Sequence, residues 1–297
     1  MRQSVLISFL LVLVSFVWAG SFIVVDSVTK NGMNPVDLGF LRFLVATPLM
    51  VLLVLVQRKK LAVPLKELPW VIVLGLTGVT FLYVFQFIGI SLTTASTSAV
   101  LINTNVIFIA ILSWFFLHEH LTRHRVAGIA LSFVGVVIVL YSKVSPEEFS
   151  LSNMFVVGCI LMLLSALCWA IYSLVGKRLL NTYDPFVITT YAFVLGSILY
   201  VPLVISHIGG VVVNTTPVQW LAVLYLALTC SIFGYLGWYY ALKHSEASKA
   251  AVFLNLIPLF AITMSFLLGE SLTVFFFVGA SLIIYGVYLA QRNNSKM

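Results

Sequence analysis

The sequence predicts an all-α integral membrane protein with ten transmembrane helices, built as two inverted repeats of five helices. Three observations lead to this fold class. The 297 residues are 62% apolar and 8% charged, with a mean hydropathy of +1.14, whereas a soluble protein carries about 25% charged residues. One long motif occurs twice, half a chain length apart. The Lys and Arg residues gather in alternate loops.

The repeated motif runs from Ala95 to Thr122 and again from Ala247 to Thr273. Each copy has small residues, an Asn, an apolar run and a final Glu-x-Leu-Thr. Asn103 of the first copy therefore matches Asn255 of the second, and Glu119 matches Glu270. Trp18-Ala19 likewise recurs as Trp169-Ala170. We therefore expect repeats at 1–142 and 153–292, joined by a linker at 143–152.

The apolar runs are long enough to cross a bilayer. Its hydrocarbon core of about 30 Å requires about 20 helical residues, and a backbone in lipid pairs its polar groups within the helix. The predicted spans are 4–26, 36–57, 69–90, 95–117, 124–142, 153–177, 185–207, 217–242, 247–269 and 273–291. Because the first run exceeds the ~7–15 residues of a signal-peptide core, we interpret it as a retained span.

The basic residues predict the orientation. With the N-terminus inside, the inner segments hold nearly all Lys and Arg residues outside the spans, and the outer loops hold Lys30 and Lys143. Cytoplasmic loops carry this excess, so both termini are expected in the cytoplasm, with the protein in the plasma (inner) membrane. The Lys and Arg residues that set the orientation also account for the net charge of +7. The net charge is therefore no sign of nucleic-acid binding, which is not expected. Five helices being an odd number, the second repeat enters the membrane inverted, as in many secondary transporters.

This arrangement resembles the EamA-type branch of the drug/metabolite transporter superfamily. The resemblance rests on the five-helix unit, the paired Asn-containing segments, the Trp-Ala of each first helix and Arg42-Phe43, and it covers essentially the whole chain. It implies a ten-helix carrier of small metabolites, often an exporter of amino acids or related compounds, with a central cavity lined by both halves. Two features depart from an exact duplication: Pro258 stands opposite Val106, and no second cation matches Arg42.

Polar groups within the spans are candidates for the cavity. Asn103 and Asn255 are expected to line it, although a hydrogen bond between helices is the alternative. Pro258 lacks a backbone donor and frees a carbonyl in its helix, which predicts a bend or a contact with substrate.

Aromatic residues are candidates for the cavity walls. Tyr83 and Gln86 share one helix face, as do Tyr235 and Trp238, because three residues separate each pair. With Tyr239, Trp18 and Trp169 they would supply the apolar walls and few polar groups that small-molecule pockets combine. Aromatic packing or anchoring at the membrane interface is the alternative.

Arg42 is the most informative single residue. It lies about two turns into the second span, where a cation is costly. It either reaches the outer interface or contacts a substrate carboxylate or phosphate, and Asp26 and Asp37 are the nearest acids that could neutralise it. Glu119 and Glu270 end the fourth and ninth spans, and a structural role in capping the helix that follows is expected for both.

The predicted function is alternating-access transport of small metabolites, as an exporter and not an enzyme. A sugar-phosphate or nucleotide-sugar exchanger is the alternative within the superfamily. A membrane enzyme or a scaffold subunit is less favoured, because the nine acidic residues are scattered and the loops are short. No cofactor or metal is expected, since the histidines near Glu119 lack H-E-x-x-H spacing. The expected partners are a small-molecule substrate and lipid, for a monomer or homodimer.

Overall fold

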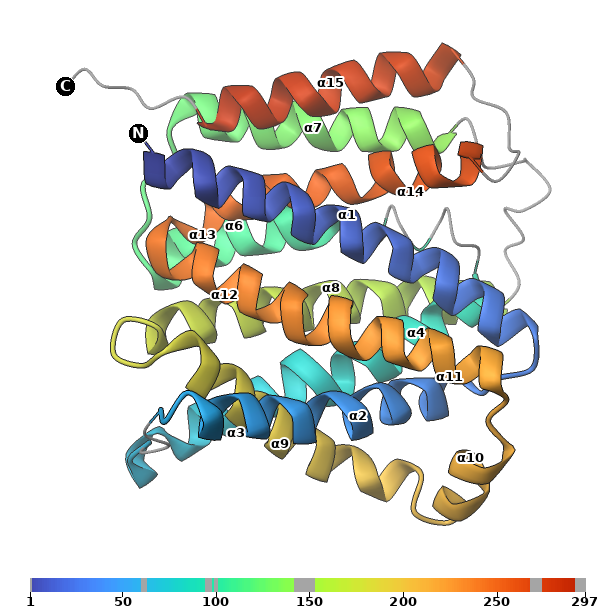
Figure 1. The fold of residues 1–297 in the computed structure, drawn as a ribbon. Helices are drawn as coiled ribbons and strands as arrows, with labels where there is room; N and C mark the ends of the chain where they lie inside the picture. The colour runs from blue at the N-terminus through green and yellow to red at the C-terminus, as the bar shows by residue number, and fades with distance from the viewer. Residues whose placement is uncertain are drawn as a thin grey trace.

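The computed structural model describes residues 2–59, 63–93, 98, 101–141, 153–267 and 274–291, and every element in this part of the chain is helical (Figure 1). The α-helices are α1 (Arg2–Lys30), α2 (Pro35–Val56), α3 (Leu68–Gly75), α4 (Phe81–Leu92), α6 (Thr104–Phe116), α7 (Arg123–Tyr141), α8 (Asn153–Leu179), α9 (Pro185–Tyr200), α10 (Ile208–Asn214), α11 (Pro217–Tyr225), α12 (Gly234–His244), α13 (Ala247–Ala251), α14 (Leu256–Leu267) and α15 (Val274–Gln291). The expected linker at 143–152 and Glu270 lie outside the described residues.

In the part of the chain that the structure describes, five short segments interrupt or extend these helices. Those at η1 (Leu65–Glu67), η4 (Val201–Leu203) and η6 (Val252–Asn255) are 3₁₀-helical. Those at η2 (Leu76–Thr80) and η5 (Leu226–Phe233) are π-helical. The two π segments occupy matching places in the repeats, since η2 connects α3 to α4 and η5 connects α11 to α12.

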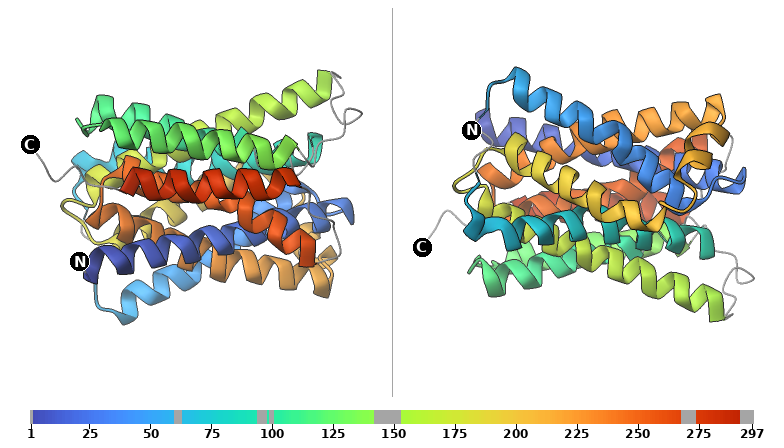
Figure 2. Two further views of the ribbon diagram at one scale, coloured as in Figure 1. Left: turned by 90° about the horizontal axis from the view of Figure 1, so that it is seen from above. Right: turned by 90° about the horizontal axis from the view of Figure 1, so that it is seen from below.

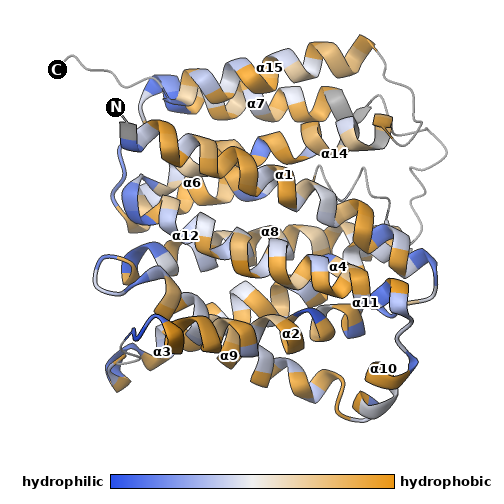
Figure 3. Ribbon diagram, viewed as in Figure 1, coloured by the Kyte–Doolittle hydropathy of each residue, from blue (hydrophilic) through white to orange (hydrophobic). Residues whose placement is uncertain are grey.

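The helices are those of a multi-pass membrane protein. Among the described residues, seven continuous helical stretches are long and apolar enough to cross a membrane, and shorter apolar helices cover Thr104–Phe116 and Ala247–Ala261. Hydrophobic residues fill the middle of the bundle, and hydrophilic residues gather where helices begin and end (Figure 3). Large apolar side chains such as Phe115, Phe277 and Tyr288 are exposed on the outside, where lipid would cover them.

The helices run side by side along roughly one common direction (Figure 2). The start of α1 and the end of α15 lie at one end of the bundle, which we name the terminal end; the α1–α2 turn and α10 lie at the other, the far end (Figure 1). Local capping fixes where several helices begin. Asn34 accepts a 2.8 Å hydrogen bond from the amide of Val36, and Asp184 accepts one of 3.0 Å from the amide of Phe186. Each of these capping residues is followed directly by a proline, which the first turn of a helix tolerates.

The packing repeats when the two halves are exchanged. Helix α8, the first of the second half, packs against α4 and α6, and α1 packs against their counterparts α12 and α14. Similarly, α9 packs against α3, and α2 packs against α11 and η5. Two halves with equivalent sequences thus make equivalent contacts with each other.

Glycines bring α7 and α15, the last helix of each half, into close contact. A Cβ added at Gly128 would lie 2.6 Å from the carbonyl oxygen of Gly286, and one added at Gly286 would lie 2.7 Å from that of Gly128. Gly135 faces Gly279 in the same way, also at 2.7 Å. Such small residues allow membrane helices to approach backbone to backbone.

Candidate functional site

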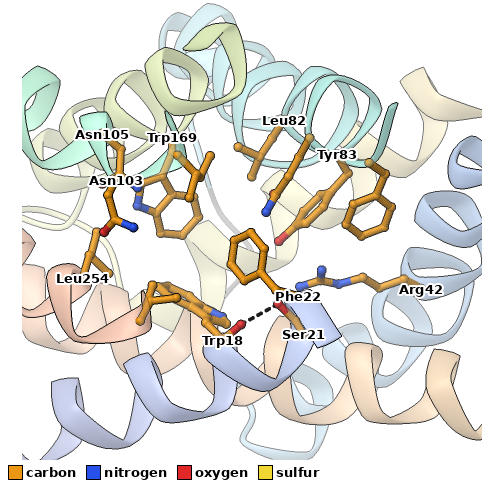
Figure 4. Close-up of a pocket in the computed structure, with 14 residues that line it drawn as sticks. Trp18, Ser21, Phe22, Arg42, Leu82, Tyr83, Asn103, Asn105, Trp169 and Leu254 are labelled. Carbon is orange, nitrogen blue, oxygen red and sulfur yellow. Dashed lines mark hydrogen bonds between the residues drawn. The ribbon is translucent and has the colours of Figure 1, made fainter. Parts of the chain in front are cut away.

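A cavity lies where the two halves meet, between α1, α2, α4, α6, α8 and the start of α14 (Figure 4). The space between the residues that line it, together with the part of that space that opens to the surroundings, measures about 560 Å³. Fourteen described residues line it: Trp18, Ser21, Phe22, Arg42, Leu82, Tyr83, Gln86, Phe87, Ile102, Asn103, Asn105, Trp169, Leu254 and Ile257. Most are apolar or aromatic, and Arg42 is the one charged side chain among the fourteen.

Arg42 points into the protein and does not reach the interface. Its side chain is 2% exposed. Nε donates a 2.6 Å hydrogen bond to Ser231 Oγ, and the Tyr83 ring lies 4.1 Å from the guanidinium carbon in a cation–π contact. The two acids that sequence reasoning considered as partners are engaged elsewhere: Asp26 pairs with Lys30, and Asp37 contacts His207.

The π-helical segment η5 positions the partner of Arg42. Ser231 lies in this segment and donates its hydroxyl to the carbonyl of Leu226, five residues earlier. A π turn commonly marks a functional place in a helix. Ser231 could not be identified from the sequence, because its counterpart in the first half is Val79 and periodicity does not reveal a π turn.

Equivalent aromatic residues of the two halves touch each other beside the cavity. The rings of Trp18 and Trp169 meet edge to face, with centroids 5.0 Å apart and planes at 89°. The hydroxyl groups of Tyr83 and Tyr235 lie 3.0 Å apart. Residues that contact their own repeat equivalents lie where the two halves adjoin.

The two tryptophans nevertheless differ in their hydrogen bonds. Trp18 Nε1 donates a 2.9 Å hydrogen bond to the carbonyl of Cys230 in η5. The matching acceptor for Trp169 would be Gly78 in η2, but that carbonyl accepts a hydrogen bond from the Tyr235 hydroxyl. Trp169 Nε1 is buried and has no hydrogen-bond partner among the described residues. The two halves are therefore in different local conformations.

A break at Asn103 turns a further amide toward the cavity. Helix α6 begins at Thr104, directly after Asn103, which sequence reasoning placed inside one continuous helix. Because the chain turns there, Asn105 lines the cavity together with Asn103. The regular spacing of three and four residues excluded Asn105, so the sequence analysis missed it. Asn105 is 6% exposed, and its Oδ1 has no partner among the described residues.

The structure brings six of the predicted cavity residues together in this lining. They are Trp18, Arg42, Tyr83, Gln86, Asn103 and Trp169. Five of these six belong to the first half of the chain.

The other five predicted residues, all from the second half, lie outside the lining. The indole of Trp238 donates a 3.1 Å hydrogen bond to Ser173 Oγ, and Tyr239 stacks on Tyr172 with ring centroids 4.8 Å apart. Tyr235 contacts Tyr83 and Gly78, as described above. Asn255 donates a 2.6 Å hydrogen bond to Ser132 Oγ, and Pro258 is buried in the first turn of α14, where a missing amide proton is tolerated.

Glu119 joins the two halves at the terminal end. Its carboxylate accepts hydrogen bonds from the backbone amides of Ala247 (2.6 Å) and Ser248 (3.0 Å) and from Ser248 Oγ (2.6 Å). It therefore meets the N-terminus of α13, in the other half of the chain, and not that of α7, the helix that follows it. The hydroxyl of Thr122 takes that place, accepting a 3.2 Å hydrogen bond from the amide of Arg125.

Two cations complete this connection, which we name the terminal latch (Glu119, Arg125, Lys177, Glu246 and Ser248). Arg125 donates to Ser248 Oγ at 3.0 Å and pairs with Glu246. Lys177 donates to the carbonyls of Leu242 and Ser245. The latch ties the ends of α6 and α8 and the start of α7 to the α12–α13 turn, between the terminal end and the cavity.

These features define a class: a multi-pass membrane protein made of two equivalent halves around a cavity. Family comparison agrees, because the model of the EamA-like transporter family matches residues 5–141 and again residues 156–291. The chain belongs to the EamA-like transporter family.

Individual relatives extend over nearly the whole chain. A protein of Archaeoglobus fulgidus described as an uncharacterized transporter is 38% identical over 97% of this chain and 98% of its own length. A probable amino-acid metabolite efflux pump of Salmonella typhimurium is 29% identical over 95% of this chain and 93% of its own. A crystal structure with 20% identity covers 98% of this chain and 97% of its own, with a TM-score of 0.78, and thus shares the fold.

Proposed function

We propose that this protein is a secondary transporter that exports small metabolites, such as amino acids or related compounds, across the cytoplasmic membrane by alternating access. The observation that carries the proposal is the cavity between equivalent helices of the two halves, beside the contact of Trp18 with Trp169. In transporters with inverted repeats, substrate binds at the repeat interface and the two halves exchange conformations. The Salmonella relative's description as an efflux pump supports the direction and the substrate class.

The proposal includes ten spans in two inverted halves, at 1–142 and 153–292. Three of these spans are composites of shorter segments: α3 with η2 and α4, α11 with η5 and α12, and α13 with η6 and α14. The equivalent packing of α1 and α8, each against the corresponding helices of the other half, supports the repeat. Both termini are placed in the cytoplasm, so that the terminal latch closes the cytoplasmic side.

Topology is tested by labelling single cysteines introduced at Lys66 and Asn214, after replacement of Cys159, Cys168 and Cys230. We expect a membrane-impermeant maleimide to reach position 214 from outside intact cells and position 66 only after the membrane is opened. Labelling of both positions from the same side would exclude the inverted arrangement.

Transport is tested by counterflow of radiolabelled amino acids and their derivatives in proteoliposomes. We expect flux with the native chain and at least a tenfold loss in a variant that combines Arg42→Ala and Asn103→Ala, two of the residues that line the cavity. Unchanged flux in this variant would reject the site. A sugar-phosphate exchanger, the alternative within the superfamily, would instead show exchange of phosphate esters.

A further inference from the structure

The charge of the cavity specifies its ligand more narrowly than the fold does. This inference rests on the proposed function and deepens it. Arg42 is 2% exposed, and no carboxylate of the described residues forms an ion pair with it. A buried cation without a counter-ion is unfavourable, and Arg42 lies where a ligand could supply the missing charge, at the wall of the cavity (Figure 4).

The guanidinium is fixed with its end toward the cavity. Ser231 holds it through Nε, and its central carbon lies over the Tyr83 ring, 4.1 Å from the ring centroid. The edge that carries Nη1 and Nη2 remains directed at the cavity interior (Figure 4). A guanidinium edge pairs with a carboxylate through two parallel hydrogen bonds, so this geometry suits a planar carboxylate.

Charge balance in the cavity favours a ligand with one negative charge over a ligand with two or with none. Arg42 is the one charged residue among the fourteen that line the cavity. A phosphate monoester carries nearly two negative charges at neutral pH and would leave an excess negative charge in the cavity. A zwitterionic amino acid would bring an ammonium group, for which the fourteen residues offer no carboxylate. A monocarboxylate without an ammonium group neutralises the site.

The other residues that line the cavity indicate what the rest of the ligand is like. Trp18, Phe22 and Phe87 provide an aromatic wall for a flat or branched apolar body. Two buried polar groups have no partner among the described residues: Asn105 Oδ1, an acceptor, and Trp169 Nε1, a donor. Buried polar groups are normally satisfied, so a ligand hydroxyl or amide would complete the hydrogen bonds of one or both.

We propose that the cavity binds small monoanionic carboxylic acids that have an aromatic or branched body and no ammonium group, with the carboxylate on Arg42 and a ligand donor group on Asn105. This class includes hydroxy acids and N-acylated derivatives of apolar amino acids.

Four compounds with a similar aromatic body test the charge rule. They are 3-phenyllactate (a monoanion), L-phenylalanine (a zwitterion), phenethylamine (a cation) and phenyl phosphate (close to a dianion). Binding to the purified protein in nanodiscs is followed by tryptophan fluorescence, since Trp18 and Trp169 line the cavity, and counterflow in proteoliposomes is measured in parallel. We expect phenyllactate to bind at least tenfold more tightly than each of the other three. Equal or tighter binding of phenylalanine, phenethylamine or phenyl phosphate would overturn the proposal.

Two substitutions assign the contacts. Arg42→Gln should weaken phenyllactate binding at least tenfold without weakening that of phenethylamine, whereas Arg42→Lys should retain part of it. Asn105→Asp adds a carboxylate and should shift the preference from phenyllactate toward phenylalanine. Unchanged phenyllactate binding in Arg42→Gln, or an unchanged preference in Asn105→Asp, would refute the corresponding contact. Comparison of ligands on the native chain decides the charge rule even if a variant does not fold.

The outcomes separate this inference from the proposed function. Transport of phenylalanine in preference to phenyllactate would refute the ligand class and leave a transporter. Tight binding of phenyllactate without flux of any of the four compounds would support the binding site and count against transport.

Discussion

Trp18 and Trp169 hold equivalent positions in the two halves and touch each other at 5.0 Å, yet the indole N–H of Trp18 is hydrogen-bonded and that of Trp169 is not. The difference lies in the π-helical carbonyls: Cys230 accepts from Trp18, while Gly78 accepts from Tyr235. If the halves exchange conformations during transport, the exchanged state has Trp169 bonded to Gly78 and Tyr83 bonded to Cys230.

This exchange predicts opposite effects for two equivalent substitutions. Tyr235→Phe removes the hydrogen bond to Gly78 of the present state, and Tyr83→Phe removes the bond to Cys230 of the exchanged state. The hydrogen bond between the two hydroxyl groups is lost in both variants and is common to both states, so it does not alter their ratio. A buried hydrogen bond contributes about 1 kcal/mol, so each change should shift the ratio of the two states about fivefold, in opposite directions. Maleimide labelling of a single cysteine at Leu254 from the terminal end should accelerate in Tyr235→Phe and slow in Tyr83→Phe. A shift in the same direction for both would contradict the exchange.

Gly234 makes the Trp18 hydrogen bond possible. A Cβ at this position would lie 2.4 Å from Trp18 Nε1, so Gly234→Ala must displace the indole from Cys230. Loss of the hydrogen bond together with overpacking should lower the free energy of unfolding by about 1–3 kcal/mol and reduce counterflow. Gly209→Ala is the matched control, because nothing lies within 4 Å of its added Cβ. Equal thermal stability of the two variants would show that the close contact does not constrain Trp18.

Much of the fold could be predicted from the sequence because lipid imposes length and composition on each helix. The predicted second span at 36–57 compares with α2 at Pro35–Val56, and that at 185–207 begins with α9 at Pro185. The breaks at Asn103 and in η6 were not predicted, since a turn of one or two residues leaves an apolar run intact. The π-helical segments were not predicted for the same reason, because one extra residue per turn does not alter the hydropathy of the span.

The site could be predicted only in part, and the duplication itself explains why. Equivalent residues have the same sequence signal, so Asn103 and Asn255 were equal candidates. In the structure Asn103 lines the cavity, whereas Asn255 is packed against the last helix of the first half and contacts Ser132. Conformation, and not residue type, distinguishes them. Likewise, the residues that Glu119 binds lie 128 and 129 positions away, beyond what local capping rules address.

The contact of Gly128 with Gly286 predicts that α7 and α15 tolerate no side chain between them. Gly128→Leu should force the helices apart and lower the melting temperature of the detergent-solubilised protein, with a loss of about 1–3 kcal/mol or more. Val134→Leu, at a position 49% exposed on the same helix, is the control. A substitution that left stability intact but changed the oligomeric state would instead identify Gly128 as part of a dimer face.

The terminal latch predicts how the cavity opens toward the terminal end. Glu119→Gln keeps the shape of the side chain but removes the charge, and its amide nitrogen can no longer accept a hydrogen bond from the segment that begins at Ala247. Hydrogen bonds to a charged group contribute about 1.5–3 kcal/mol each, so a net loss of about 2 kcal/mol should raise the population open at the terminal end about thirtyfold.

Hydrogen exchange measures this opening directly. The amides of Ala247 and Ser248 should exchange about thirtyfold faster in Glu119→Gln, while those of α9, to which the described hydrogen bonds of Glu119 do not extend, keep their rates. Asp26→Asn is the matched control, because Asp26 is also a carboxylate held by a polar contact, an ion pair with Lys30, but lies at the far end. Unchanged exchange at Ala247 and Ser248 would mean that Arg125 and Lys177 close this end without Glu119, and the combined Glu119→Gln and Lys177→Gln variant would then be the one to open it.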